Sequence, residues 1–258
     1  GPIWGSMPWR AGDWLARKVT DALSLQYLFL PSSWQLLRHP WFQAADIVQL
    51  YNTHGGYFSH SVLGVASRRK PFIWRLSDMW PLTGHCCYAY DCERWKTGCG
   101  ACPLLRDEPA LKTDRTALLW NMKKQIYAGA DVTLVAPSRW IARLAEQSPL
   151  VGHWPVRVIP NGLNLNVFRP IDQASARAVL GLPQNEDLVL FSSVETQAYR
   201  KGGTFVAAAV DALKGKTRKP FRLVVVGNRA SEWERVVNVP VTAIETVKDD
   251  HLLAILYS

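Results

Sequence analysis

All five cysteines of the chain lie within one short segment, so this segment is the first place to look for chemistry. They are Cys86, Cys87, Cys92, Cys99 and Cys102. Chance would distribute five cysteines over all 258 residues, so the clustering indicates a metal site, a pair of disulfides or a redox site. Two of them are separated by two residues, the spacing that is typical of zinc sites. The clustering alone does not define a function.

Three polar residues precede the cysteines and have side chains that could take part in chemistry. Ser77 and Asp78 directly follow residues 71–76, which we predict to form a strand. A serine hydroxyl can hydrogen-bond a substrate, but it is neither an acid nor a base near neutral pH. Asp78 is expected either to orient a substrate or to cap the next turn. His85 is expected to contact a ligand, to bind a metal or to be a packed polar residue.

Two glycine-containing turns are expected at the carboxyl ends of predicted strands. Their residues are His54, Gly55 and Gly56 in the first turn, and Asn161 and Gly162 in the second. In α/β proteins ligands bind at this edge of the sheet, and an Asn-Gly turn with positive φ presents backbone amides there. Both turns are therefore candidate ligand contacts, and the alternative is that each is an ordinary connection.

A basic pair followed by glycine has the chemistry of a diphosphate site. Arg200 and Lys201 precede Gly202 and a predicted helix over residues 204–213. Lysine supplies a point charge and arginine a two-pronged donor, and the start of a helix favours anions. The alternative is an exposed basic pair with no ligand.

The composition indicates a globular chain with a large core. Hydrophobic residues make up 48% and there are 12 tryptophans, which argues against disorder. We find no apolar run of about 18 residues and no secretory signal. A cytosolic setting is therefore expected, and there clustered cysteines favour metal over disulfides. Tryptophans near the start, such as Trp4, Trp9, Trp14 and Trp34, are expected to serve packing rather than binding.

The formal net charge of +9 is spread along the chain. Residues 68–70 and the pair Lys123 and Lys124 are the visible basic clusters. The simplest interpretation is a solvated basic surface, and the functional alternatives are phosphate-bearing substrates or an anionic membrane surface. Nucleic acid is not expected as a partner, because the basic residues are scattered and no recognition motif is present.

Short apolar runs alternate with helical patterns along the whole chain. We predict strands at 46–51, 71–76, 131–136, 156–159, 188–191, 221–226 and 241–244. Helices are expected over 13–30, after the capping residue Ser138, over 174–180, over 204–213 and near the end. This alternation predicts an α/β fold with two successive Rossmann-like, doubly wound parallel sheets.

The expected domain boundary lies at residues 168–172, which gives domains 1–170 and 171–258. The second domain would hold only three strands, and a buried-type sheet edge would remain open. The first ten residues do not resemble an initiator sequence, and no strand is predicted before the first helix. We therefore expect a fragment, with the first domain lacking its start and the second truncated.

The segment Val158-Ile-Pro-Asn-Gly-Leu-Asn-Leu-Asn-Val-Phe-Arg-Pro170 resembles the end of the N-terminal domain in GT-B glycosyltransferases of the large retaining family 4 (group 1). Asn164 stands where that family usually has Asp. Further similar motifs are Ala136–Trp140, Arg200–Gly202, Leu223–Gly227 and Asp249–Ser258. Their order and spacing agree across roughly residues 40–258.

The cysteine segment resembles one bacterial branch of that family, whose members mostly serve surface-polysaccharide assembly. The shared run is Trp74-Arg-Leu-Ser-Asp-Met-Trp80 with Thr-Gly-His-Cys behind it, and residues 46–58 are also similar. The branch pattern matches Cys86, Cys92, Cys99 and Cys102, and it leaves Cys87 as an extra cysteine. Many members have His where this chain has Ser77, which puts a role of Ser77 in the chemistry in doubt.

The resemblance implies a GT-B enzyme that moves a sugar from a nucleotide-diphosphate sugar to a surface-polysaccharide or lipid-linked acceptor with retention. Domain 1–170 would bind the acceptor and carry the cysteine-rich insertion at about 77–105, and 171–258 would be part of the donor domain. No cofactor is expected for transfer, but a structural zinc is expected on the four matched cysteines.

The implied site residues are spread over both domains. The catalytic candidates are Ser77 and Asp78, and the diphosphate candidates are Arg200, Lys201 and Gly202. The acceptor or cleft candidates are His54, Gly55, Gly56, His85, Asn161 and Gly162. The family's Glu-x7-Glu element would lie beyond Ser258, so the chain alone is expected not to turn over.

A cytoplasmic location is implied, with peripheral contact to the inner membrane face. An alternative from another class is a non-catalytic module in which the cysteine-rich domain binds a glycan or a partner. A GT-B phosphorylase or an epimerase-like enzyme is a further alternative.

Overall fold

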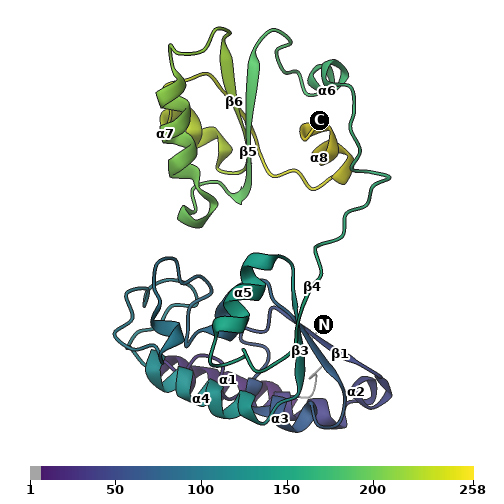
Figure 1. Cartoon of the computed structure of the whole chain (residues 1–258), viewed down its shortest axis with the longest axis vertical. Helices are drawn as coiled ribbons and strands as arrows, with labels where there is room; N and C mark the ends of the chain where they lie inside the picture. The colour runs from purple at the N-terminus through teal and green to yellow at the C-terminus, as the bar shows by residue number, and fades with distance from the viewer. Residues whose placement is uncertain (1–6) are drawn as a thin grey trace. The chain divides into compact units, whose positions relative to one another are not determined.

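The structure is a computed structural model that describes residues 7–258. It contains two compact units, Gly1–Asn161 and Gly162–Ser258 (Figure 1). The boundary between the units therefore lies between Asn161 and Gly162, whereas the predicted boundary lay at residue 170. Neither residue has positive φ or belongs to a turn, so the prediction of an Asn-Gly turn with positive φ is wrong. Each unit contains one parallel sheet with helices, so the predicted fold class is confirmed.

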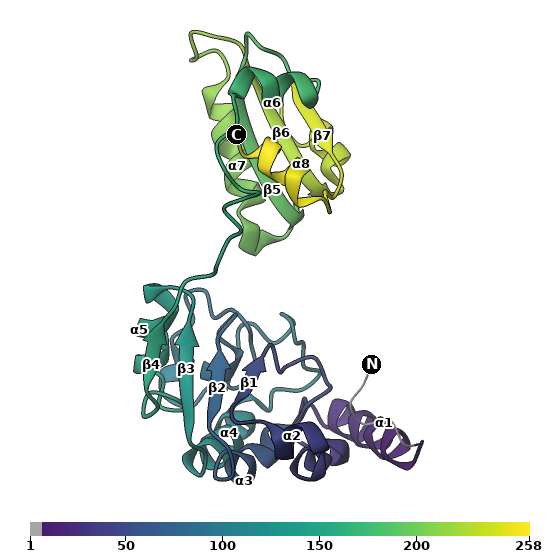
Figure 2. The same cartoon turned by 90° about the vertical axis from the view of Figure 1, so that its right-hand side faces the viewer.

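The first sheet consists of four parallel strands in chain order. They are β1 (Val48–Tyr51), β2 (Phe72–Arg75), β3 (Val132–Ala136) and β4 (Val156–Val158). Figure 2 shows them side by side, pointing in the same direction. Phe72, Trp74 and Leu134 are almost fully buried, because the sheet packs helices against the large apolar side chains of its strands. The carboxyl ends of all four strands consequently meet at one edge.

The helices of the first unit connect these strands. They are α1 (Met7–Ala22), α2 (Pro40–Ala44), α3 (Leu63–Ala66), α4 (Thr116–Ala128) and α5 (Arg139–Gln147), with 3₁₀ turns η1 (Pro31–Arg38) and η2 (His60–Val62). Ser138 caps α5 by accepting from the backbone N–H of Ile141 at 3.5 Å, as predicted. The first helix ends at Ala22, well before residue 30.

The tryptophans near the start do not all serve packing. Trp14 on α1 is 63% exposed, and Trp9 and Trp34 are partly exposed. The expectation of packing is therefore wrong for Trp14, because most of its side chain faces solvent. Trp4 lies outside the described residues.

The cysteine-rich segment is an insertion between β2 and α4 that contains only short 3₁₀ turns, η3 (Trp80–Leu82) and η4 (Arg94–Lys96). Helix α4 anchors it. The ammonium of Lys123 donates to the carbonyls of Trp80 at 2.7 Å and Thr83 at 2.9 Å, and the indole of Trp120 donates to the carbonyl of Trp95 at 2.9 Å. Lys123 is only 3% exposed, so the prediction of a solvated basic surface is wrong for this residue.

The second unit contains three parallel strands, β5 (Asp187–Glu195), β6 (Phe221–Asn228) and β7 (Val241–Ile244). Successive side chains of β6 alternate between two cores. Leu223 and Val225 pack with Val210 of helix α7 (Gly203–Leu213), whereas Val224 and Val226 pack with Leu256 of helix α8 (Asp250–Leu256). This continuous apolar run is what a strand covered on both faces requires.

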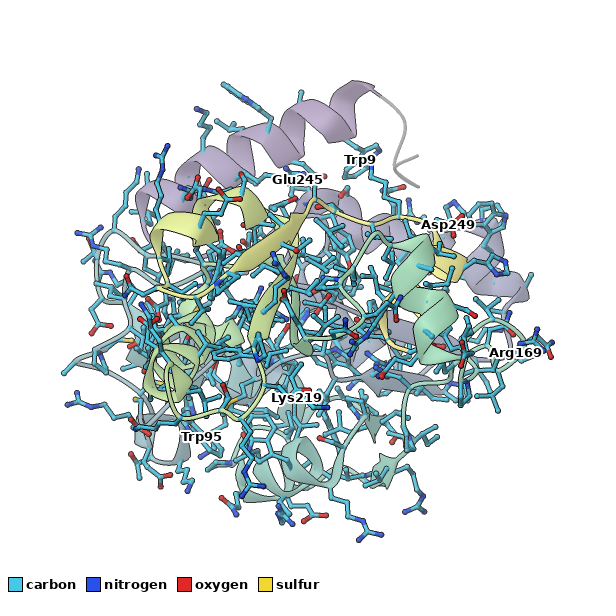
Figure 3. The ribbon with its side chains drawn as sticks, turned by 90° about the horizontal axis from the view of Figure 1, so that it is seen from above. Trp9, Trp95, Arg169, Lys219, Glu245 and Asp249 are labelled. Atoms are coloured by element: carbon cyan, nitrogen blue, oxygen red, sulfur yellow. The ribbon has the colours of Figure 1, made fainter. Side chains whose placement is uncertain are left out.

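The remaining elements of this unit are one helix and two 3₁₀ turns. They are α6 (Gln173–Val179) and the 3₁₀ turns η5 (Tyr199–Lys201) and η6 (Ala230–Arg235). Figure 1 shows α7 on one side of the sheet, with α6 and α8 on the other. Asp249, labelled in Figure 3, caps α8 by accepting from the backbone N–H of Leu252 at 2.8 Å.

None of the helices in the described part of the chain combines the length and the apolar character needed to cross a membrane.

Candidate functional site

Arg75 organises the carboxyl edge of the first sheet. It is the last residue of β2, and its guanidinium lies over the ring of Tyr51 at 5.0 Å, at the end of β1. It donates to the hydroxyl of Ser77 at 3.3 Å and to the side-chain oxygen of Asn161. The structure therefore brings together Ser77 and Asn161, which were predicted separately, through an arginine that the sequence analysis did not single out.

A second group lies at the same ends of β1 and β2. The Nε2 atom of His54 is 3.6 Å from Oδ2 of Asp78, and the His54 ring is stacked near the ring of Trp80, with 5.8 Å between centroids. The other oxygen of Asp78 accepts from the backbone N–H of Trp80 at 2.9 Å. Asp78 thus has the expected capping contact and also faces His54.

The loop that carries His54 is shaped by its glycines and by Tyr57. Gly56 has φ +71°, and a Cβ atom there would lie 3.2 Å from the ring of Tyr27. The hydroxyl of Tyr57 donates to the carbonyls of Tyr51 at 3.0 Å and Asn52 at 2.9 Å. Gly56 therefore has a conformational role in placing His54, whereas at Gly55 an added Cβ atom would lie 3.1 Å from the ring of Tyr57.

A buried polar network supports this loop from below. His60 is hydrogen-bonded to the hydroxyls of Thr53 at 2.7 Å and Tyr127 at 2.8 Å. Burial, with the charge of Lys123 as a smaller cause, holds the pKa of His60 well below its ordinary value, and burial raises the pKa of Tyr127. His60 is therefore a neutral structural residue adjacent to the loop, and no sequence motif identifies it.

Lys123 lies between the Asp78 group and the cysteines. Burial lowers its pKa to about 7, and nearby thiols and Asp78 oppose that shift. Its ammonium is 3.4 Å from the ring centroid of Trp80. The sequence does not predict that Lys123 is buried, because its neighbour Lys124 is also a lysine and is exposed.

Four of the cysteines line one small cavity, which is the set predicted to hold zinc. Cys86, Cys92, Cys99 and Cys102 share this cavity with His85. All five cysteines are free thiols, and burial raises the pKa of Cys86 to about 12 and that of Cys99 to about 11. Within the described chain, no three ligand atoms of this set lie as close together as 4.8 Å.

His85 belongs to the cysteine cavity rather than to the edge of the sheet. It is 1% exposed, and its Nδ1 atom lies 4.0 Å from the sulfur of Cys102. Its buried Nε2 atom has no hydrogen-bond partner among the described residues. A polar atom in this position is costly without a partner, so His85 is a candidate donor to an ion in this cavity. The described cavity offers sulfur and imidazole donors, but no three of them lie as close together as the ligands of one bound zinc.

The basic pair in the second unit lies just before a helix. Arg200 and Lys201 are exposed residues of η5, and Gly202 adopts φ 78° immediately before α7. The next glycine, Gly203, is required by packing, because a Cβ atom there would lie 2.6 Å from the carbonyl oxygen of Thr196. The geometry therefore places two cations beside the amino-terminal end of a helix.

A polar network lies at the carboxyl ends of β5 and β6. Glu195 accepts from the side-chain amide of Asn228 at 2.9 Å, and Gln197 donates to Glu232 at 2.6 Å. Arg229 donates to the same Glu232 at 2.7 Å from a left-handed backbone conformation with φ 61°. Arg229 is a candidate ligand contact that the sequence analysis missed, because it follows a strand without any motif.

Comparisons with known proteins find glycosyltransferases over parts of the chain. WcaC of Escherichia coli strain K12, which is named as a colanic acid biosynthesis glycosyl transferase, is 34% identical over 96 residues, 36% of this chain and 23% of WcaC. A D-inositol 3-phosphate glycosyltransferase of Nocardia farcinica is 33% identical over 105 residues, 41% of this chain and 23% of that protein. A counterpart from Acidothermus cellulolyticus is 39% identical over 87 residues, 31% of this chain and 19% of that protein.

Among solved structures, a glycosyltransferase from Rickettsia africae ESF-5 aligns with 96% of this chain and 52% of its own, at a TM-score of 0.48 and 13% identity. No family model matches the chain. The chain is thus similar in sequence to glycosyltransferases over about a third of its length, and it spans less than a quarter of the curated relatives named here.

Proposed function

We propose that the whole protein is a glycosyltransferase that uses a nucleotide-diphosphate sugar. The observation that carries this proposal is the 34% identity over 96 residues to a named glycosyl transferase. Two parallel-sheet units support it, because open α/β sheets bind ligands at the carboxyl edges of their strands and each unit has polar residues at that edge.

In this proposal the second unit binds the donor diphosphate. Arg200 and Lys201 would neutralise its charge, and the start of α7 after Gly202 would add the favourable end of the helix dipole. As the bond to the sugar breaks, negative charge grows on the leaving diphosphate, so fixed cations stabilise the transition state more than the ground state.

The first unit would bind the acceptor at the edge formed by His54, Ser77, Asp78 and Asn161. Ser77 cannot exchange a proton near neutral pH, so its role would be to hydrogen-bond a hydroxyl group of a substrate. Asp78 would orient the acceptor. Transfer with retention, a surface-polysaccharide or lipid-linked acceptor, and a cytoplasmic location at the inner membrane face are parts of the same proposal.

We also propose that the cysteine cavity holds a structural zinc. Cys86, Cys92, Cys99 and Cys102 would provide a closed set of four sulfur ligands, and His85 is an additional donor in the same cavity. Such an ion would stabilise the insertion, which has almost no regular secondary structure of its own. No step of sugar transfer is assigned to this ion.

Titration calorimetry with UDP and GDP tests the donor assignment. We expect binding by the 258-residue chain that Lys201→Ala weakens about tenfold or more, since a charge-assisted hydrogen bond contributes roughly 1.5–3 kcal/mol. Lys219→Ala is the matched control, because Lys219 (Figure 3) is an exposed lysine of the same unit in the turn before β6. Glycan binding that is indifferent to nucleotides would instead support the non-catalytic module.

A further inference from the structure

We infer that His54, Asp78 and Cys87 form a binding site for a divalent transition-metal ion, separate from the cysteine cavity. One ligand atom from each residue lies within 4.8 Å of the other two, and in the described part of the chain this is the group of three or more such residues that meets that distance. A nitrogen, an oxygen and a sulfur donor together match Zn²⁺ best.

The distance between the first two donors supports an ion between them. His54 Nε2 and Asp78 Oδ2 are 3.6 Å apart, which is longer than a hydrogen bond. Two ligands of one tetrahedral zinc lie about 3–4 Å apart, because each metal–ligand bond is about 2.0–2.3 Å long. The pair therefore has the separation of two ligands of the same ion.

The frame around the three donors is already formed. Oδ1 of Asp78 is held by the backbone N–H of Trp80 at 2.9 Å, which leaves Oδ2 directed at His54. The backbone N–H of Met79 donates to the carbonyl of Cys87 at 2.8 Å. This hydrogen bond connects the residue after Asp78 directly to Cys87. Hydrogen bonds of this kind orient metal ligands.

Burial and charge also fit a bound cation. Asp78 and Cys87 are 8% and 6% exposed, and the His54 side chain is 20% exposed, so an ion can enter from the His54 side. A carboxylate and a thiolate together balance the two charges of the metal, which removes the cost of an unpaired buried charge. Binding breaks the S–H bond of Cys87 and releases that proton to solvent as the sulfur–metal bond forms.

This inference gives a role to the one cysteine that the zinc pattern leaves out. Cys86 lines the cavity with the other three cysteines, whereas its neighbour Cys87 lies with Asp78 and His54. Three protein ligands leave one coordination position open, unlike four thiolates. At the carboxyl edge of the sheet, that position would take water or an oxygen atom of a ligand. The inference does not depend on the proposed glycosyl transfer.

Metal loading of the reduced chain with Co²⁺ and Zn²⁺ tests the site. Bound metal is measured by mass spectrometry after desalting, and Co²⁺ is also followed by its thiolate charge-transfer absorption. We expect Cys87→Ser to remove one metal equivalent per chain, and we expect Asp78→Asn and His54→Gln to weaken that equivalent about tenfold or more. Asp78→Asn keeps an acceptor for the Trp80 N–H.

The matched controls are Asp91→Asn and His153→Gln, which change exposed residues of the same unit and should leave the metal content unchanged. Cys99→Ser reports separately on the cysteine cavity. The inference is overturned if metal binding is lost in Cys99→Ser but is unchanged in Cys87→Ser and His54→Gln, or if the reduced chain binds no metal. If Cys87→Ser does not fold, as judged by circular dichroism, the partly exposed His54→Gln decides the question.

Discussion

At the residue scale, burial decides which titratable groups keep their ordinary behaviour. His60 is 4% exposed and is bonded to two hydroxyl groups, so its neutral form is favoured and its pKa lies well below the ordinary value. As the pH falls, the unfolded chain therefore takes up a proton at this position before the folded chain does. The stability that His60 contributes is complete above about pH 6.5 and is lost as the pH falls toward its folded pKa.

Replacing His60 tests this reasoning. Between pH 7 and pH 5 we expect the free energy of unfolding of the unmodified chain to fall because of this residue, with a slope of at most about 1.4 kcal/mol per pH unit. The variant His60→Gln should lack that part of the slope, although it will be less stable at pH 7. Urea unfolding at several pH values measures both chains. His153→Gln should keep the full slope, and equal slopes for His60→Gln and the unmodified chain would contradict the prediction.

Residues that are adjacent in sequence can also lie in different environments. Cys86 and Cys87 are neighbours in sequence, but they line different clusters. The same holds for Lys123, which is buried, and Lys124 beside it, which is not. Residue type alone cannot make this distinction, because it depends on which elements pack on each side of the backbone.

At the scale of the element, Gly227 ends the buried part of β6. It adopts φ +136°, and a Cβ atom at this position would overlap the carbonyl oxygen of Ser193 on β5. The strand register shifts between Ser192 and Glu195 at this point. Glycine is therefore needed both for its backbone conformation and for the close approach of the two strands.

We expect Gly227→Ala to destabilise the second unit by more than about 2 kcal/mol, because both the backbone and the contact must shift. Gly181→Ala is the matched comparison, since Gly181 also has positive φ but no atom within 4 Å of its added Cβ. Its cost should be about 1 kcal/mol. Thermal unfolding of both variants measures the difference, and equal losses would show that φ alone matters at Gly227.

At the scale of the whole molecule, each unit has its own core. Leu134 is fully buried in the first unit and Leu223 in the second. The core of the first unit shares no residue with the two cores of the second unit. A cavity in one core should therefore act on the unit that contains it, and the stability of the other unit should be unaffected.

Hydrogen exchange with mass spectrometry checks this independence. Leu223→Ala should cost about 2–5 kcal/mol in the second unit and increase exchange in peptides from β5, β6 and β7. Peptides from β1 to β4 should keep their protection, and Leu134→Ala should produce the reverse pattern. Loss of protection in both units with either variant would show that they unfold as one.

The strands and the helices α1, α5, α6, α7 and α8 could be predicted from local patterns, whereas α2, α3 and α4 were not predicted. β-branched and aromatic runs between turn residues identify strands, and a residue such as Ser138 identifies the start of a helix. The length of α1 was not predictable in this way, because the apolar residues after Ala22 continue the pattern although the chain turns. The exposure of Trp14 was not predictable either, because it depends on whether another element of the fold packs against this side chain.

The amino-acid sequence by itself determined the α/β class, the parallel sheets and the positions of Ser77, Asp78, Asn161 and the basic pair at Arg200 and Lys201, because these follow from patterns within a few residues. Only the tertiary structure decided which of them meet. Arg75 joins Ser77 to Asn161, and His54, Asp78 and Cys87 come together from two loops. Parallel strands bring distant segments to one edge of a sheet, so these contacts depend on strand order and loop packing, which no local pattern contains.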